Sequence, residues 1–320
     1  MKTISAEQRP LQRIRVTRGV GRGRHRSSNP TRRRRDEDDD PHEFDILEKG
    51  GKGWSWMKEK KYKRMFEEIE GGLEGVLGSG SFDWVDRRVF DQVFDRSTLM
   101  GLYKLMKNGT IDTLEFPIAR GKEAHVFYAI GPRGPVAVKI FHTSNAVFKN
   151  LMQYIEGDPR FGGLKRRHRD LVTIWVRKEH RNLTRLKKWN LRVPEPIAVF
   201  QNVLVMEYLG NEEGPSPKLR DVVIEDAESV FDELLEFLCI CWNDAKLVHA
   251  DFSPYNILWH DGQPMVIDVG QAVALQHPNA KEFLVRDVTR LVEWANKRGV
   301  EVNIAEAMYE VLHYRDSEEE

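Results

Sequence analysis

Three oxygen-bearing side chains stand close together in the second half of the chain and could hold a divalent metal ion beside a phosphate. Asp251 and Asn256 occupy a short loop between apolar residues, and Asp268 ends the apolar run that follows. The intervening Asp261-Gly262 pair is typical of a β-hairpin turn. With a three-residue loop Asn256 would face Asp268 directly, and with a two-residue loop it would be one position off.

Carboxylate and carboxamide oxygens, one or two per ion, hold magnesium in phosphoryl-transfer sites while water and phosphate complete the coordination shell. Asn256 and Asp268 are therefore predicted metal ligands, and Asp251 would orient an attacking hydroxyl or water. Taken alone, an Asp-Gly hairpin flanked by Asp and Asn is also an ordinary surface turn. The prediction therefore depends on residues further upstream.

Two charges placed among apolar residues supply that support. In the predicted strand 136–141, Lys139 points to the same side as Ala137 and Phe141. In the helix predicted over 170–186, Glu179 falls within the apolar stripe of Leu171, Trp175, Leu183 and Leu186. The other faces of that helix take Arg177, Lys178, Arg181 and Lys187 or Lys188. Because a buried charge needs a partner, we expect Lys139 to pair with Glu179; the alternative is a Glu179 that reaches solvent from the edge of the stripe.

A glycine bend precedes the lysine strand. Gly121 lies at the entrance to a strand that alternates through 126–128. Glycine at such a bend lets backbone N–H groups approach a phosphate without a Cβ in the way. Further along, a second predicted strand ends at Met206, and Glu207 to Leu209 follow it.

These features follow one another in the order of a protein-kinase core. From about residue 85 to 310 the chain resembles the RIO family of atypical kinases, and within it the first subfamily in an archaeal-like form. The matching motifs are Gly-Lys-Glu-Ala at 121–124, Leu-Val-His-Ala-Asp at 247–251 and Ile-Asp-Val-Gly-Gln-Ala-Val at 267–273, the last in place of Asp-Phe-Gly. Two departures are Ala119-Arg120, where the family usually has Ser-Thr, and Ser253-Pro254-Tyr255, where Ser-Glu-Phe is commoner.

The resemblance implies an α+β, two-lobed protein-kinase-like fold of the RIO type. A small N-lobe sheet with one long helix (the kinase helix C) would join a reduced helical C-lobe that lacks the activation segment and peptide-binding helices. The stretch after Asp268 has room only for helices predicted around 280–297 and 304–314, which agrees with a reduced C-lobe. The expected division is a disordered basic and acidic arm (1–55), a helical lead-in (56–112), the N-lobe with a long flexible loop at 141–169 (113–210), the C-lobe (211–315) and an acidic tail (316–320).

The resemblance also implies ATP and magnesium, with manganese as an alternative ion. Lys139, aligned by Glu179, would hold the α- and β-phosphates, and Asp251 and Asp268 would complete the catalytic set. Asp268 could itself receive the phosphoryl group as an acyl phosphate. The residues expected to contact the nucleotide are Ile118, Gly121, Lys122, Glu123, Ala124, Val126, Ala137, Lys139, Met206, Glu207 and Leu209.

The zero net charge conceals a strong segregation of charge. Residues 1–35 carry twelve Lys or Arg, and residues 36–48 carry eight acids. This basic arm, together with the basic run 165–169, suggests contact with ribosomal RNA, although a solvated tail and a solvated loop are the alternatives. Cys239 and Cys241 fit neither a redox nor a zinc motif and are expected to be reduced. No apolar run is long enough to span a membrane, so we expect a soluble, cytoplasmic protein whose oligomeric state stays open.

The favoured function is an ATP-dependent RIO-type kinase or ATPase that acts as a switch in maturation of the small ribosomal subunit. The pre-small-ribosomal subunit as a partner rests on the resemblance and on the basic arm. One alternative is a conventional serine/threonine kinase acting on a protein substrate. The other is a catalytically silent scaffold that binds RNA or ribosomes.

Overall fold

The computed structural model describes residues 60–69, 71–73, 93–143, 152–158, 160 and 168–314. The chain divides into two units, Met1–Gly50 and Gly51–Glu320, and every described residue belongs to the second. The predicted arm at 1–55 and the tail at 316–320 therefore lie outside the described residues. Residues 165–167 of the basic run lie outside them as well. The last two residues of that run, His168 and Arg169, begin a helix.

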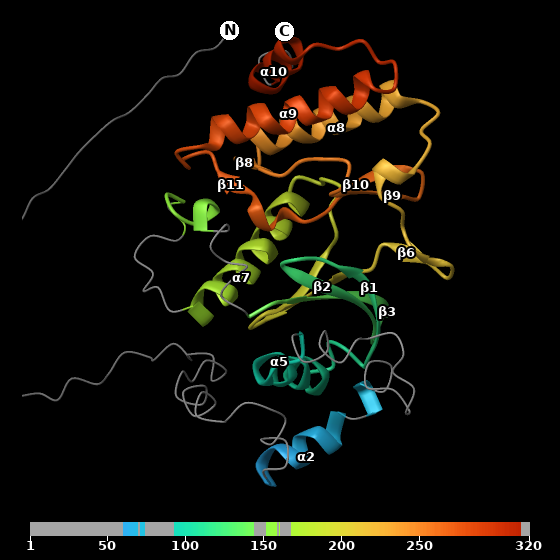
Figure 1. Ribbon diagram of the computed structural model, residues 1–320, viewed down its shortest axis with the longest axis vertical. Helices are drawn as coiled ribbons and strands as arrows, with labels where there is room; N and C mark the ends of the chain where they lie inside the picture. The colour runs from blue at the N-terminus through green and yellow to red at the C-terminus, as the bar shows by residue number, and fades with distance from the viewer. Residues whose placement is uncertain are drawn as a thin grey trace, which may run out of the picture. The chain divides into compact units, whose positions relative to one another are not determined.

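A five-stranded antiparallel sheet forms the N-lobe. Its order is β1 (Thr113–Arg120), β2 (Ala124–Gly131), β3 (Gly134–Phe141), β5 (Val203–Glu207) and β4 (Pro196–Phe200) (Figure 1). Val126 stands opposite Lys139, and Ala137 stands opposite Met206. Because directly opposite residues project from the same side of a sheet, these four side chains share one face.

In the part of the chain that the structure describes, three α-helices and one short 3₁₀ helix accompany the sheet. The longest is α7 (His168–Lys187), which contacts β4 and β5 and runs between the sheet and the helical end of the molecule (Figure 1). Next to the sheet lies α5 (Arg96–Lys107), whose N-cap Asp95 accepts the Thr98 amide at 2.8 Å. Beyond it come α2 (Lys60–Ile69) and the short η3 (Gly71–Leu73). The helices α5, α2 and η3 fall within 56–112, the stretch predicted as a helical lead-in, of which residues 74–92 lie outside the described residues.

The C-lobe is built on three helices that pack against one another: α8 (Ala227–Asn243), α9 (Ala280–Asn296) and α10 (Ile304–His313) (Figure 1). All three were expected from the sequence. Short paired strands lie between α8 and α9: β8 (Leu247–Val248) with β11 (Val273–Ala274), and β9 (Ile257–His260) with β10 (Gln263–Val266). The remaining short elements are β6 (Gly210–Asn211), β7 (Gly214–Pro215), η4 (Met152–Tyr154), η6 (Leu219–Asp221) and η7 (Val269–Gln271).

Both cysteines lie inside the C-lobe. Cys239 and Cys241 are buried on α8 and unpaired. Burial raises the pKa of the Cys239 thiol to about 12 and raises that of Cys241 as well, so neither thiol is activated. Among the helices of the described residues, none has the length and apolar character required to cross a bilayer.

Two observations differ from expectation: the first concerns a side chain of α7, and the second concerns the connection at 141–169. Lys178, predicted on an outer face of α7, is fully buried. Its ammonium donates to the Gly270 carbonyl at 2.6 Å, because the C-lobe segment η7 packs against this side of α7. The connection at 141–169 was expected to be flexible, but its part 152–158 is packed: Tyr154 is buried against Trp175 and Phe283.

Candidate active site

A lysine and two carboxylates meet where the two lobes face each other. The Lys139 ammonium donates to both oxygens of Glu179 on α7, at 2.7 and 3.0 Å, and to Oδ1 of Asp268 at 2.9 Å. Lys139 and Glu179 are buried, whereas the Asp268 side chain is 44% exposed. The expected pairing of Lys139 with Glu179 is confirmed, and the solvent-edge alternative for Glu179 is wrong. Asp268 remains accessible as a third member of this cluster.

Lys139 and Asp268 hold each other in the ionised form. Burial by itself would lower the pKa of Lys139, but the carboxylates of Asp268 and Glu179 outweigh it and raise that pKa. Burial would likewise raise the pKa of Asp268, yet the Lys139 ammonium lowers it. For Glu179, which is buried most deeply, burial raises the pKa against the opposing effect of Lys139. The result is a fixed cation and an ionised carboxylate at the cleft.

The bend between β1 and β2 lies against the same cleft. It is tight: the Gly121 amide donates to the Ala124 carbonyl at 2.9 Å, and a Cβ on Gly121 would stand only 3.1 Å from that oxygen. His142 follows β3 and braces the bend, since its Nε2 lies 3.4 Å from the Gly121 carbonyl and 3.0 Å from Nδ1 of His125. Contact between this bend and a phosphate stays a prediction from the sequence.

Glu123 within the bend is strongly perturbed. Burial and the negative charge of Asp268 raise the pKa of Glu123 to about 7, and the carboxylates of Glu179 and Asp251 act in the same direction. The side chain therefore faces the same cleft as those three acids. A carboxyl group that titrates near neutral pH beside the proposed phosphate position is a functional-site signal.

The loop at 251–256, called the catalytic loop below, is followed by a hairpin with a two-residue turn. His260 pairs with Gln263, and the Ile267 amide donates to the Asn256 carbonyl at 2.9 Å. Asn256 therefore stands one position off from Asp268, which is the second of the two registers considered. Asp268 itself has φ 59° and ψ 56°, a left-handed conformation that turns the chain into η7.

The carboxylate of Asp251 is held on both sides. Asn256 donates its Nδ2 to Oδ2 of Asp251 and to the Asp251 carbonyl, each at 2.9 Å. Arg290 on α9 donates to Oδ1 at 2.8 Å. The first contact fixes the amide group of Asn256 with its nitrogen toward Asp251. The second was not expected from the sequence, because nothing local places α9 beside this loop.

A metal ion fits the donor set of this cleft. Because the side-chain nitrogen of Asn256 donates to Asp251, its side-chain oxygen Oδ1 is left for a cation. Asp268 uses Oδ1 for Lys139, which leaves Oδ2. One carboxylate and one amide oxygen, with phosphate and water filling the other positions, match the hard-oxygen preference of magnesium.

The catalytic loop depends on an aspartate that sequence reasoning missed. Asp287 on α9 is fully buried, and its carboxylate accepts the amides of Ala250 at 2.7 Å and Phe252 at 3.0 Å. Ala250 has φ 67°, an unfavourable value for a residue with a Cβ, and Arg286 also donates to its carbonyl. The signal was available: Asp287 lies among apolar positions of its helix, as Glu179 does.

The segment after Asp268 is also anchored by side chains that sequence reasoning missed. Asn182 on α7 donates to the carbonyls of Val269 at 2.8 Å and Ala272 at 3.1 Å. Arg160 links this network to Asp158 and donates to Oδ1 of Asn182 at 2.9 Å. Together with Lys178, these groups fix η7 against α7 and so fix the position from which Asp268 reaches Lys139.

The expected nucleotide contacts fall on three parts of the fold. Val126, Ala137 and Met206 lie on the sheet face that carries Lys139, and Ile118 lies near the end of β1. Lys122 and Ala124 belong to the glycine bend, where Lys122 is exposed and Ala124 buried. Glu207 ends β5, and Leu209 is buried just beyond it. These positions all lie on the N-lobe sheet, at its glycine bend or just beyond β5, and their contact with a nucleotide stays a prediction.

The N-lobe is an antiparallel sheet with one long helix, and a hinge joins it to a helical second lobe. A Lys–Glu pair and a set of Asp, Asn and Asp lie at the junction. Together these features define the protein-kinase class of fold. A family model described as "RIO domain" matches residues 125–308. The chain belongs to this RIO family, and it is an ATP-dependent kinase of the serine/threonine-protein kinase type.

Individual relatives agree with this assignment. The chain is 40% identical over 226 residues to the RIO-type serine/threonine-protein kinase Rio1 of Haloferax volcanii, a match that covers 70% of this chain and 77% of the relative. It is 36% identical over 235 residues to human serine/threonine-protein kinase RIO1, covering 72% of this chain but 41% of the human protein. The crystal structure of the Rio2 kinase-ADP/Mg2+-phosphoaspartate complex from Chaetomium thermophilum is similar in fold, with a TM-score of 0.51, 20% identity and coverage of 66% of this chain and 65% of that one.

Proposed function

We propose that this protein transfers the γ-phosphoryl group of magnesium-bound ATP, and that turnover of the nucleotide acts as a switch in maturation of the small ribosomal subunit. The observation that carries the enzymatic part is the cluster of Lys139, Glu179 and Asp268, set beside the Asp251–Asn256 pair. Catalysis of phosphoryl transfer is mostly positioning and charge stabilisation, and these five groups supply both.

Each residue has a distinct task. Lys139 binds the α- and β-phosphates, and Glu179 keeps its ammonium directed into the cleft. Asn256 and Asp268 would hold magnesium (manganese has the same oxygen preference), and the ion would neutralise charge on the phosphates. Asp251 orients the attacking hydroxyl or water and takes its proton. The backbone of the Gly121 bend covers the phosphates, and Glu207 with Leu209 contacts the adenine.

Asp268 can also act as the phosphoryl acceptor. Its free carboxylate oxygen attacks the γ-phosphorus, the bond from that phosphorus to the β–γ bridging oxygen breaks, and ADP leaves with the electron pair. Water, oriented by Asp251, then attacks the phosphorus, which releases inorganic phosphate and restores the carboxylate. The exposed half of the Asp268 side chain supports this step. So does the Rio2 kinase structure from Chaetomium thermophilum, which is a phosphoaspartate complex.

The cellular part of the proposal rests on the family resemblance and on the charge of the arm. Twelve basic residues within 1–35 suit contact with ribosomal RNA, and the basic run 165–169 would add to it. Reduced, buried cysteines fit a cytoplasmic location. Hydrolysis would then release the protein from an immature small subunit. Asp251→Ala should therefore bind ATP but stay associated with those particles on a sedimentation gradient, and free sedimentation of the variant would contradict the switch.

The chemical test uses ATP labelled at the γ-phosphate. An acyl phosphate on Asp268 predicts a protein-bound label that hydroxylamine removes and that Asp268→Asn does not acquire. A label that resists hydroxylamine would instead lie on serine or threonine. Circular dichroism of Asp268→Asn serves as the control for folding.

A further inference from the structure

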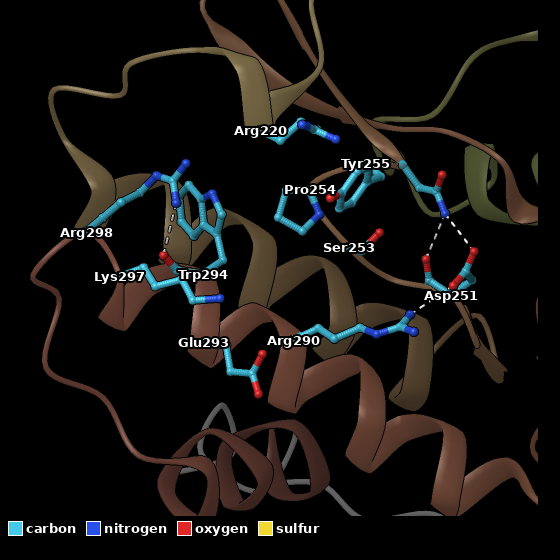
Figure 2. Close-up of a pocket in the computed structure, with 11 residues that line it drawn as sticks. Arg220, Asp251, Ser253, Pro254, Tyr255, Arg290, Glu293, Trp294, Lys297 and Arg298 are labelled. Carbon is cyan, nitrogen blue, oxygen red and sulfur yellow. Dashed lines mark hydrogen bonds and ion pairs between the residues drawn. The ribbon is translucent and has the colours of Figure 1, made fainter.

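A pocket of about 510 Å³ opens directly beside the loop that carries Asp251 and Asn256 (Figure 2). Its floor is the loop segment from Asp251 to Asn256, and one wall is the C-terminal half of α9 with the residues that follow it. Arg220 of η6 closes the opposite side. The volume lies within the range of ligand-binding pockets. None of the tasks proposed above for ATP or magnesium uses this wall.

Basic residues outnumber acidic residues in the lining of the pocket. Its two carboxylates belong to Asp251 and Glu293. Its four basic side chains are Arg220, Arg290, Lys297 and Arg298. Figure 2 shows the Lys297 ammonium directed into the pocket and the Arg290 guanidinium directed toward Asp251. Such a surplus of positive charge in a concave site attracts an anionic ligand.

Two of the guanidinium groups are fixed by stacking. The Arg220 group lies 4.4 Å from the centre of the Tyr255 ring, and the Arg298 group lies 4.5 Å from that of Trp294. Arg220 also forms an ion pair with Asp221 at 3.0 Å, and Arg298 donates to the Trp294 carbonyl at 3.2 Å. Only the remaining N–H groups of each guanidinium are therefore left for oxygen acceptors. Trp294 is buried, and its indole nitrogen has no hydrogen-bond partner among the residues that the structure describes.

Arg290 connects the pocket to catalysis. It occupies Oδ1 of Asp251 at 2.8 Å, while Asn256 occupies Oδ2. A nucleophile that is to give its proton to Asp251 needs one of these oxygens. An anion bound among the basic residues would compete for Arg290, because a second acceptor at similar distance divides its hydrogen bonds. Filling the pocket would therefore free Oδ1 at the moment an acceptor arrives.

We propose that the pocket binds an acidic or phosphorylated polypeptide segment that carries the acceptor serine or threonine, and that its anionic side chain draws Arg290 away from Asp251. The hydroxyl oxygen then attacks the γ-phosphorus, its proton passes to Asp251, and ADP leaves with the bridging oxygen. This inference rests on the proposed role of Asp251. The carboxylate of Glu293 at the pocket disfavours a continuous phosphate backbone, and the family is one of protein kinases, so a polypeptide is favoured over RNA.

The binding test measures fluorescence anisotropy of a labelled peptide in which glutamates flank one serine, with a glutamine-for-glutamate peptide as its neutral counterpart. The acidic peptide should bind the full-length protein more tightly. Lys297→Ala should weaken that binding about two- to fivefold, the effect of one partly exposed ion pair, and Lys297→Glu by on the order of tenfold. Lys281→Ala removes an exposed cation from the other end of α9 and should change nothing.

The kinetic test uses Arg290→Gln. In this variant the ratio of kcat/KM for the acidic peptide to kcat/KM for the neutral peptide should fall toward one. Its ATP turnover without peptide should rise, because Arg290 no longer pairs with Asp251. A purely structural role for Arg290 would lower both rates together and leave the preference unchanged, which would overturn the coupling.

Two further outcomes would overturn the pocket assignment. Equal binding of the acidic and neutral peptides would remove the anionic specificity. The second outcome concerns single-stranded RNA. If an RNA oligonucleotide displaces the acidic peptide, binds more tightly than it and loses affinity in the same Lys297 variants, RNA is the ligand.

Peptide binding without any phosphoryl transfer would contradict the proposed function but keep the pocket. Transfer without selective peptide binding would do the reverse.

Discussion

Lys139 and Asp268, 129 residues apart in the chain, are joined by a hydrogen bond of 2.9 Å that links the N-lobe sheet to the C-lobe. Glu179 completes the contact from α7. The lysine is thus shared between a buried carboxylate that holds it in place and a half-exposed one that faces the cleft. A nucleotide bound between the lobes would lie against this contact.

Replacing Lys139 by Ala should cost stability as well as activity. The change leaves Glu179 buried without its cation, and breaking a buried ion pair in this way lowers the free energy of unfolding by about 3–5 kcal/mol. ATP turnover should fall with it. Urea denaturation and a phosphate-release assay measure the two effects. Lys139→Ala combined with Glu179→Leu should recover stability but not turnover, and a single variant as stable as the wild type would contradict the pairing.

Asn256→Ala tests the metal site. Loss of one oxygen ligand should raise the magnesium concentration needed for half-maximal turnover by on the order of tenfold, equivalent to about 1.4 kcal/mol. The measurement is a magnesium titration of ATP turnover at fixed free ATP. The matched control is Asn211→Ala in the short strand β6, an exposed position for which no shift is expected. An unchanged titration would remove Asn256 from the proposed ligand set.

Glu123 predicts a pH dependence of stability. Its pKa is raised from 4.5 to about 7 in the folded protein, so the folded state holds the proton more strongly. The stability from this group is full below pH 4.5 and is lost as the pH rises through about 7. Glu123→Gln should therefore be more stable relative to the wild type at pH 8 than at pH 5. Thermal unfolding at both pH values checks this, and a constant difference would refute it.

Asp287→Ala should loosen the catalytic loop. It leaves the buried amides of Ala250 and Phe252 without an acceptor, which costs about 2–4 kcal/mol in the free energy of unfolding. Asp287→Asn keeps one acceptor oxygen and should lose roughly half as much. Hydrogen exchange of the two amides should quicken in the same order. If exchange stayed slow in Asp287→Ala, another group would have to hold the loop.

The secondary structure and the central ion pair could be predicted because both follow from local periodicity and the cost of burying a charge. Lys139 alternates with apolar residues in a strand, and Glu179 repeats with apolar residues in a helix, so each needed a partner of opposite sign. Asp287 carried the same signal and was missed because its partners are backbone amides, which leave no mark in the sequence.

Lys178 shows where such reasoning stops. Its position on α7 falls outside the first apolar stripe, and only the packing of η7 on that side buries it. Arg290 is similar: its helical position is ordinary, and its importance comes from the placement of α9 beside Asp251. Periodicity describes one element at a time and cannot say which neighbour will cover a second face.

The amino-acid sequence by itself determined the elements and the paired charges, since these depend on residue type and on spacing within a single strand or helix. Tertiary structure alone decided the two-residue hairpin register, the anchoring of η7 and the catalytic loop, and the basic pocket beside Asp251. Each of these requires groups from distant parts of the chain to meet, and it is the packing of whole elements that brings them together.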